Sequence, residues 1–163
     1  MLQVNNCKVL ALCALMLIAV GCKKDKENEP SPAQSTQSIA GNVATPSWTL
    51  SDDYDMSSSM TVVTKVDLAL TYASEVSSTG WEVAAGDLLA AFEGETCVGL
   101  AQPIDGLFYL YVTASQSGAD VALKYYSAKL KNIFVAQEKL TYSTDDRIGD
   151  IAEPYTPKWT VAK

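Results

Sequence analysis

The sequence of 163 residues contains no histidine. This excludes serine and cysteine triads that use histidine, and it removes the usual zinc sites and the commonest general base. Positive charge is also scarce, because 12 Lys and Arg stand against 19 Asp and Glu for a net charge of −7. Nucleic-acid binding needs a basic face, so this balance argues against nucleic acid, and no nucleic-acid partner is expected. Hydrophobic residues, at 48 %, are frequent enough for one packed domain.

Long apolar runs are lacking too, and the run near the N-terminus is short. As a helix, residues 9–20 would span about 18 Å at ~1.5 Å per residue, against a hydrocarbon core of roughly 30 Å. The run therefore predicts the core of a signal peptide and not a membrane-spanning helix.

The apolar run ends in Ala19-Val20-Gly21-Cys22, which resembles the lipobox of bacterial lipoproteins. The resemblance implies that residues 1–21 are a signal peptide and that Cys22 becomes the acylated first residue, which would anchor the protein to a membrane. Ala19 departs from the pattern, because Leu is the commoner residue at that position. The alternative is an ordinary secretory signal that leaves Cys22 as a free thiol.

Residues 22–45 are poor in apolar side chains. The stretch 23–38 has no aromatic and no branched aliphatic residue, so it cannot bury enough surface to offset its ordering entropy. We therefore predict a disordered linker over 22–45. Its acidic residues Asp25, Glu27 and Glu29 resemble the export signals of surface-displayed lipoproteins in Bacteroidetes-type bacteria. That resemblance implies an outer-membrane, cell-surface location, and a merely solvated spacer is the alternative.

Cysteine is almost absent from the rest of the chain. Of the four cysteines, Cys7 and Cys13 lie in the predicted signal and Cys22 is the predicted acylation site, which leaves Cys97. A disulfide within the predicted domain, residues 46–163, is therefore excluded, and the core alone must hold the fold. Cys97 is interpreted as a small core residue.

Alternation of apolar and polar residues marks the strands of this domain. Between Met60 and Leu70, five of the six even-numbered residues are apolar, whereas Lys65 and Asp67 fall among the odd-numbered ones. This pattern predicts one half-buried strand over 60–70. A helix over 68–77 is not expected, because Thr, Tyr and Val interrupt any apolar stripe of helical period.

A glycine divides two further apolar segments into a hairpin. Gly94-Glu95 predicts a two-residue turn in which Gly94 supplies the positive φ. In that register Phe92 faces Cys97 and Ala90 faces Gly99, which makes one side of the hairpin small enough for a second sheet to approach closely.

More strands follow toward the C-terminus. The segments 107–113 and 121–128 are rich in Phe, Tyr, Leu and Val, a second hairpin is expected to turn at 129–132, and a final strand is expected over 133–136 or 140–144. Turn residues at intervals of roughly 8–12 residues are typical of β-sandwiches. We predict an all-β, antiparallel two-sheet sandwich of about seven or eight strands, with helices packed on a sheet as the alternative.

Four segments carry a family resemblance: Asp87-Leu-Leu-Ala-Ala-Phe92, Cys97-Val-Gly-Leu-Ala-Gln-Pro103, Leu123-Lys-Tyr-Tyr-Ser-Ala128 and Ile148-Gly-Asp-Ile-Ala-Glu-Pro154. Together, over roughly residues 54–160, they resemble an immunoglobulin-like or adhesion-like β-sandwich module of Bacteroidetes-type surface lipoproteins. The resemblance implies an extracytoplasmic accessory module, and it brings no catalytic residue with it.

Carboxylates gather in two loop-like stretches: Asp52, Asp53 and Asp55 in the first, and Asp145, Asp146, Asp150 and Glu153 in the second. A glycoside hydrolase would need two of them about 5–10 Å apart across a sugar, whereas carboxylates on loops are usually only solvated. The spacing from Asp145 to Asp150 also matches no EF-hand, which weighs against calcium.

Trp81 is the candidate ligand-binding residue. It follows the turn-like stretch 77–80, so we expect it at an exposed loop tip, where its ring could stack on a sugar; the alternative is a core-edge tryptophan. Trp48 and Trp159 are expected to close the sandwich where the terminal segments meet.

The sequence thus predicts a lipid-anchored, surface-displayed protein that acts as a non-catalytic binding or structural module without a cofactor. Its expected partners are the membrane, through Cys22, and a glycan or an envelope or host protein. Two alternatives stay open: a small carboxylate-dependent glycoside hydrolase and a self-assembling envelope subunit.

Overall fold

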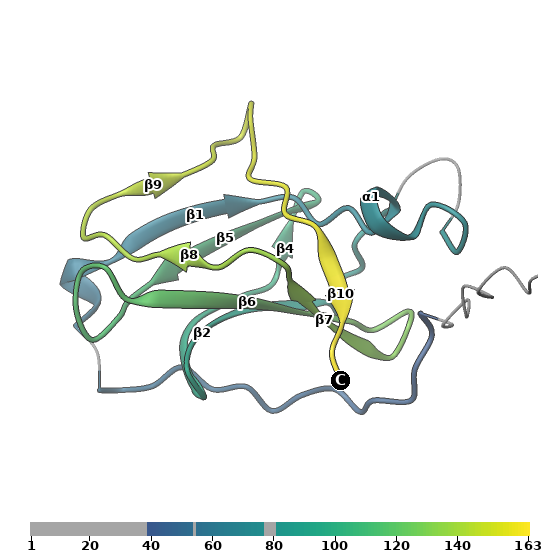
Figure 1. Ribbon diagram of the computed structural model, residues 1–163, viewed down its shortest axis with the longest axis horizontal. Coiled ribbons are helices and arrows are strands. Elements are labelled where there is room, and N and C mark those ends of the chain that lie inside the picture. The colour runs from purple at the N-terminus through teal and green to yellow at the C-terminus, as the bar shows by residue number, and fades with distance from the viewer. Residues whose placement is uncertain (1–38, 54, 77–80) are drawn as a thin grey trace, which may run out of the picture. The chain divides into compact units, whose positions relative to one another are not determined.

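The computed structural model describes residues 39–53, 55–76 and 81–163. The predicted signal peptide, Cys22 and the linker up to residue 38 lie outside the described residues, as do Tyr54 and the stretch 77–80. Across the described ranges, no helix has the length and apolarity needed to cross a membrane. What is described is nearly all β and forms two sheets, as predicted (Figure 1).

One sheet has four strands and the other has six. The order in the first sheet is β4 (Pro103–Ile104), β5 (Leu107–Val112), β1 (Met60–Thr64) and β9 (Arg147–Ile148). The order in the second is β10 (Trp159–Val161), β7 (Asn132–Ala136), β6 (Asp120–Ser127), β2 (Leu88–Glu93) and β3 (Thr96–Ala101), and β8 (Leu140–Thr141) also pairs with β6. A short 3-10 helix, Met56–Ser58, and a single turn of α-helix, α1 (Ala69–Tyr72), complete the described elements.

The prediction of a purely antiparallel sandwich is wrong for the four-stranded sheet, which is mixed. Strands β1 and β9 run parallel, with Thr61 opposite Arg147. The reason lies in the connection before β9, where the N–H of Asp145 bonds to the Ser59 carbonyl and the Thr61 N–H bonds to the Asp146 carbonyl. These two hydrogen bonds place residues 145–148 beside the start of β1, with both segments running in the same direction. Strands of two residues, such as β9, are too short to show alternation, so the sequence predicts too few strands.

The first predicted strand is shorter than expected. Strand β1 ends at Thr64, and α1 begins at Ala69, so the prediction of one strand over 60–70 without a helix is wrong. The alternation itself persists, because Val66 and Leu68 stay buried at 1 % and 0 % exposure. It fails at Leu70, which α1 turns outward to 52 % exposure.

The hairpin at Gly94 is confirmed at its turn. Gly94 has φ 59°, and Phe92 lies opposite Cys97 as predicted. Beyond that pair the register shifts by one residue, so Gly99 faces Ala91 and not Ala90. The physical reason is a β-bulge, in which β3 carries one residue more than β2 and the facing pattern moves from one side of the hairpin to the other.

The C-terminal half follows the prediction more closely. The second hairpin turns where expected, with Ser127 opposite Asn132 and Lys131 at φ 49°. Both predicted positions for a final strand are occupied, by β7 and β8, and β10 follows them as a strand that the sequence does not predict.

The two sheets share one core centred on the ring of Tyr125. Its ring centroid lies 6.0 Å from Phe108 in the four-stranded sheet, and 6.0 Å and 5.8 Å from Phe134 and Trp159 in the six-stranded one. All four residues are 0 % exposed. Trp159 therefore closes the core, as expected for one of the terminal tryptophans.

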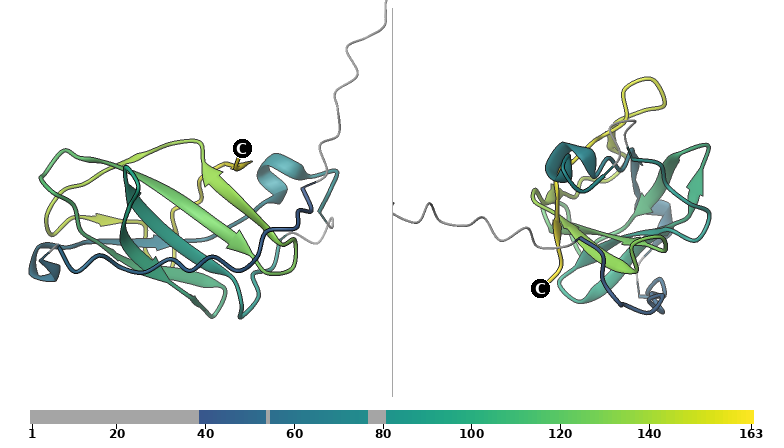
Figure 2. Two further views of the ribbon diagram at one scale, coloured as in Figure 1. Left: turned by 90° about the horizontal axis from the view of Figure 1, so that it is seen from below. Right: turned by 90° about the vertical axis from the view of Figure 1, so that its right-hand side faces the viewer.

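Residues 39–51, which we call the N-terminal strap, cross the outer face of the six-stranded sheet (Figure 2). The N–H groups of Gly41 and Val43 bond to the carbonyls of Leu130 and Lys131 at 2.8 Å each, so contacts with the domain exist ahead of the predicted boundary at residue 46. At its other end the strap places Trp48 edge-to-face on Phe92, at 5.6 Å between ring centroids.

The strap also corrects the expected role of the first hairpin. Ala90, Phe92 and Cys97 form a small second cluster under Trp48, 0–7 % exposed, and do not face the other sheet. The side of the hairpin that does approach the other sheet carries Gly99, where an added Cβ would lie 3.0 Å from the Tyr111 carbonyl oxygen.

Candidate functional site

Trp81 does not sit at an exposed loop tip. It is 9 % exposed, and its indole N–H donates to the hydroxyl of Tyr125 at 3.1 Å. The Nζ atom of Lys129 lies 5.4 Å from the ring centroid. The expectation of a solvent-facing ring is therefore wrong, because Tyr125 draws the indole into the core. Ligand binding at Trp81 stays a prediction, since one edge of the residue borders a pocket.

A buried carboxylate holds Trp81 in this position. Asp87 is 0 % exposed, and its Oδ2 accepts hydrogen bonds from the Tyr125 hydroxyl at 2.6 Å and from the Ala84 N–H at 2.8 Å. Its Oδ1 accepts from the Ala128 N–H at 2.8 Å. Asp87 thus joins the turn before β2 to the end of β6, and through Tyr125 it fixes the ring of Trp81.

The same network sets the protonation of Tyr125. Burial raises the pKa of its hydroxyl far above the ordinary value of 10.0, and the hydrogen bond to Asp87 and the charge of that carboxylate raise it further. Tyr125 is therefore a neutral donor to Asp87, and its oxygen is free to accept from Trp81.

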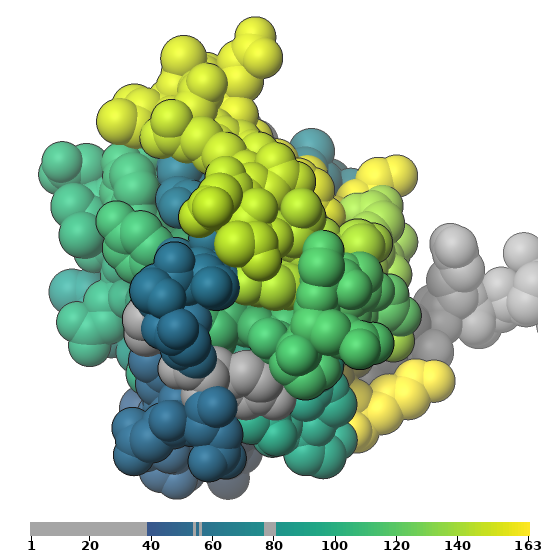
Figure 3. All heavy atoms as spheres, turned by 90° about the vertical axis from the view of Figure 1, so that its left-hand side faces the viewer, coloured from purple at the N-terminus to yellow at the C-terminus, as the bar shows by residue number. Residues whose placement is uncertain are grey.

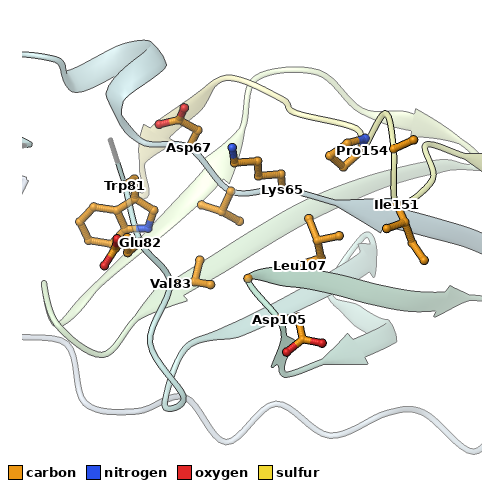
Figure 4. Close-up of a pocket in the computed structure, with 12 residues that line it drawn as sticks. Lys65, Asp67, Trp81, Glu82, Val83, Asp105, Leu107, Ile151 and Pro154 are labelled. Carbon is orange, nitrogen blue, oxygen red and sulfur yellow. The ribbon is translucent and has the colours of Figure 1, made fainter. Parts of the chain in front are cut away.

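Beside Trp81 the surface is hollowed into an open pocket of about 880 Å³ (Figure 4). Four segments that lie far apart in the sequence meet there: 65–67 after β1, 81–83 before β2, 105–107 in the β4–β5 turn, and 151–154 between β9 and β10. The pocket is thus formed by chain that leaves or enters strands, where loops on a rigid scaffold commonly bind ligands.

The pocket carries one cation among several carboxylates. Lys65, Asp67, Glu82 and Asp105 line it, from three of these segments (Figure 4). Among the described residues, none of these carboxylates is within ion-pair distance of Lys65. Asp67 Oδ1 accepts from the Ala69 N–H at 3.0 Å, and the Lys65 ammonium group and the carboxylates of Glu82 and Asp105 are the groups that can donate to and accept from a ligand.

Asp105 is placed by the turn between β4 and β5. Asp105 and Gly106 have φ values of 51° and 82°, the positive pair that a two-residue hairpin turn of type I′ requires. The turn projects the carboxylate beside Leu107, which lines the pocket at the start of β5.

The wall formed by 151–154 is held by local hydrogen bonds. A carboxylate oxygen of Asp150 accepts from the N–H groups of Ala152 and Glu153 at 2.8 Å each, and these bonds lower the pKa of Asp150. The loop presents Ile151, 69 % exposed, and Pro154 to the pocket, so apolar surface lines this side.

The first acidic stretch lies beside the start of the second at one end of the domain (Figure 3), whereas Asp150 and Glu153 belong to the loop that forms the pocket wall. The hydroxyl of Tyr142 donates to the Ser58 carbonyl, and the N–H of Asp145 bonds to the Ser59 carbonyl at 3.2 Å. Their carboxylates are exposed, and that of Asp55 is bonded to Ser57, which lowers its pKa. Within the described ranges, no group of three or more Asp, Glu or Cys residues could hold a metal ion.

Sequence reasoning misses Lys65, Glu82 and Asp105 as a group, because their segments are joined only by the fold. The Asp105-Gly106 dipeptide is a recognised hairpin signal and could have been found. Asp87 also carries a signal, since it is an acidic residue directly before the apolar run of β2.

Comparison with known proteins found no relative: no family model matches the chain, and no curated protein or solved structure matches it either.

Proposed function

We propose that this chain is a lipid-anchored, non-catalytic binding protein whose β domain takes a neutral glycan in the pocket around Lys65. The observation that supports it is the combination of an apolar wall with charged groups that form no ion pair with any residue the structure describes. A sugar offers C–H faces to apolar surface and hydroxyls that both donate and accept, so it can satisfy Lys65 and the neighbouring carboxylates together.

The charge of the pocket favours a neutral ligand. Among the described residues, the pocket is lined by three carboxylates, of Asp67, Glu82 and Asp105, and by one ammonium group, of Lys65. An acidic or phosphorylated ligand would be repelled by this excess of negative charge, as it would by the net charge of −7 on the whole chain.

The binding proposal predicts a loss of affinity when the polar groups are removed. We expect Lys65→Met and Glu82→Gln each to weaken binding about 5–10-fold, because each removes one charged hydrogen-bond partner of the ligand. The probes are a neutral β-glucan, a xylan, a mannan and a galactan, tested by affinity electrophoresis and then by calorimetry.

Lys158→Met is the matched control, because Lys158 is exposed and does not line the pocket. Absence of binding to all four glycans, or equal binding by the pocket variants and the control, contradicts the proposal. The hydrolase alternative is separated in the same samples: release of reducing ends that is lost on substituting Asp145, Asp146 and Asp150 would identify an enzyme.

The edges of the six-stranded sheet favour a binding domain over assembly by strand addition at that sheet. The outward N–H groups of β10, at Trp159 and Val161, bond to the side-chain oxygens of Thr71 and Tyr72 at 3.4 and 2.9 Å. On β3, the carbonyl of Cys97 accepts from the Ser51 N–H at 3.0 Å. Edges that are already hydrogen-bonded offer little to the strand of a neighbour.

The anchor is part of the proposal and has its own test. We expect the full chain to sediment with membranes when it is made in a bacterium with a lipoprotein pathway, and Cys22→Ser to move it to the soluble fraction. The reason is that two or more acyl chains anchor stably, whereas an unmodified thiol does not anchor at all. A soluble wild-type protein, or a variant that stays on the membrane, counts against acylation at Cys22.

A further inference from the structure

The outer face of the four-stranded sheet displays tyrosines. On β5, Phe108, Leu110 and Val112 are 0 % exposed, so the alternate residues Tyr109 and Tyr111 point away from the core. Tyr111 is 58 % exposed. Tyr111 lies opposite Thr61, whereas Tyr109 is half-buried and lies opposite Val63, which is 1 % exposed. The open part of this face is therefore around Tyr111.

This face differs from the outer face of the six-stranded sheet. There the N-terminal strap covers Phe92, leaving it 5 % exposed. No described segment covers Tyr111 in the same way, so its ring is available to a partner.

The tyrosines continue the pocket. Leu107 lines the pocket and is followed on the same side of β5 by Tyr109 and Tyr111, and Lys65 lines it just beyond the end of β1. Alternate residues of a strand are about 6.6–6.8 Å apart, so the pocket and the two rings form one line along β5.

The size of the face indicates what it can bind. Four strands at ~4.8 Å and six residues of β5 at ~3.3 Å give a surface of about 19 by 20 Å, well below the ~800 Å² per partner of a stable protein interface. A second copy of the domain is therefore disfavoured, whereas a single extended chain of sugars fits a narrow line of rings.

We infer that β5 extends the pocket into an elongated site for a glycan chain of several sugar units, in which Tyr109 and Tyr111 stack on successive rings. The inference rests on the proposed function and narrows it from a neutral sugar to an oligosaccharide bound along its length. The pocket holds one end of the chain by hydrogen bonds, and the tyrosines contact the apolar faces of the following units.

The test compares ligand lengths. Each of the four glycans is used as its disaccharide and its hexasaccharide in calorimetry with the full chain and its variants. We expect the hexasaccharide to bind at least 10-fold more tightly than the disaccharide. Tyr111→Ala should weaken the affinity for the hexasaccharide about 5–10-fold and leave the affinity for the disaccharide unchanged. Tyr111→Phe, which keeps the ring, should bind the hexasaccharide as the wild type does.

Two controls separate the outcomes. Leu70→Ala removes an equally exposed apolar side chain, 52 % exposed, outside the site and should change neither affinity. Lys65→Met should weaken both ligands. Equal affinity for both lengths, or an unchanged hexasaccharide affinity in Tyr111→Ala, overturns the elongated site while the pocket proposal stands. Absence of binding at every length overturns both.

Discussion

Replacing Asp87 by alanine is expected to cost the domain about 3–5 kcal/mol of its free energy of unfolding, enough to unfold a marginally stable domain. The variant leaves the buried Tyr125 hydroxyl and the part-buried N–H groups of Ala84 and Ala128 without their acceptor, and a fully buried group of this kind costs about 1–3 kcal/mol. Urea denaturation followed by far-ultraviolet circular dichroism measures the loss.

Asp87→Asn should be less damaging, because one amide oxygen can still accept. Glu138→Ala is the control, since Glu138 is exposed and its loss should stay within about 0.5 kcal/mol. A change below about 1 kcal/mol in Asp87→Ala would show that the network does not hold the turn before β2 against the end of β6.

Because of Tyr125, the contribution of the same network to the free energy of unfolding depends on pH. Because the pKa of Tyr125 is raised in the folded state, the unfolded chain releases this proton first. The associated stability is therefore complete below the ordinary value of 10.0 and falls as the pH rises above it. Tyr125→Phe should lose this alkaline component, and an unchanged pH profile in that variant would contradict the assignment.

Gly149→Ala should destabilise the domain by about 2–4 kcal/mol. Gly149 has φ +71°, and a Cβ built there would lie 2.5 Å from both the Tyr155 nitrogen and the Val63 oxygen. These two atoms are joined by a hydrogen bond of 2.9 Å, so the methyl group must push apart the pairing beside β1. Backbone strain of about 1–2 kcal/mol and overpacking of about 1–3 kcal/mol both contribute.

Gly118→Ala is the matched control for that prediction. Gly118 has φ +89°, and an added Cβ would meet nothing within 4 Å, so only the backbone term applies. Equal losses in the two variants would show that crowding at Gly149 contributes nothing. Because Gly149 directly precedes the wall 151–154, its variant should also bind the glycan less tightly than Gly118→Ala at the same temperature.

The all-β class could be predicted because the long strands carry their own signals. Alternation marks β1, aromatic and aliphatic residues mark β5, and Gly94 marks the turn between β2 and β3, all within a few residues of sequence. Strand β9 could not be found in this way, since two residues show no period and its parallel partner is more than eighty positions away. The single turn of α1 could not be predicted, because the apolar residues Val66 and Leu68 continue the alternation of β1 beyond the end of the strand.

The site was less predictable than the fold. Trp81 follows turn-forming residues, which favours an exposed position, but the hydroxyl of Tyr125 lies 44 residues further along and cannot be anticipated locally. Nothing in the local sequence distinguishes Lys65 and Asp105 from other polar residues, because only the folded strands bring them to one pocket. The sequence thus contains the residues but not their convergence, which depends on non-local pairing.

The N-terminal strap covers a cysteine whose reactivity measures how firmly the strap is bound. Cys97, the free cysteine of the described residues, lies 7 % exposed beneath Trp48 and Phe92, and burial raises the pKa of its thiol. Thiolate is the reactive form, so alkylating reagents attack Cys97 slowly while the strap is seated and faster once it peels away. The rate of alkylation therefore reports how often residues 39–51 detach from the six-stranded sheet.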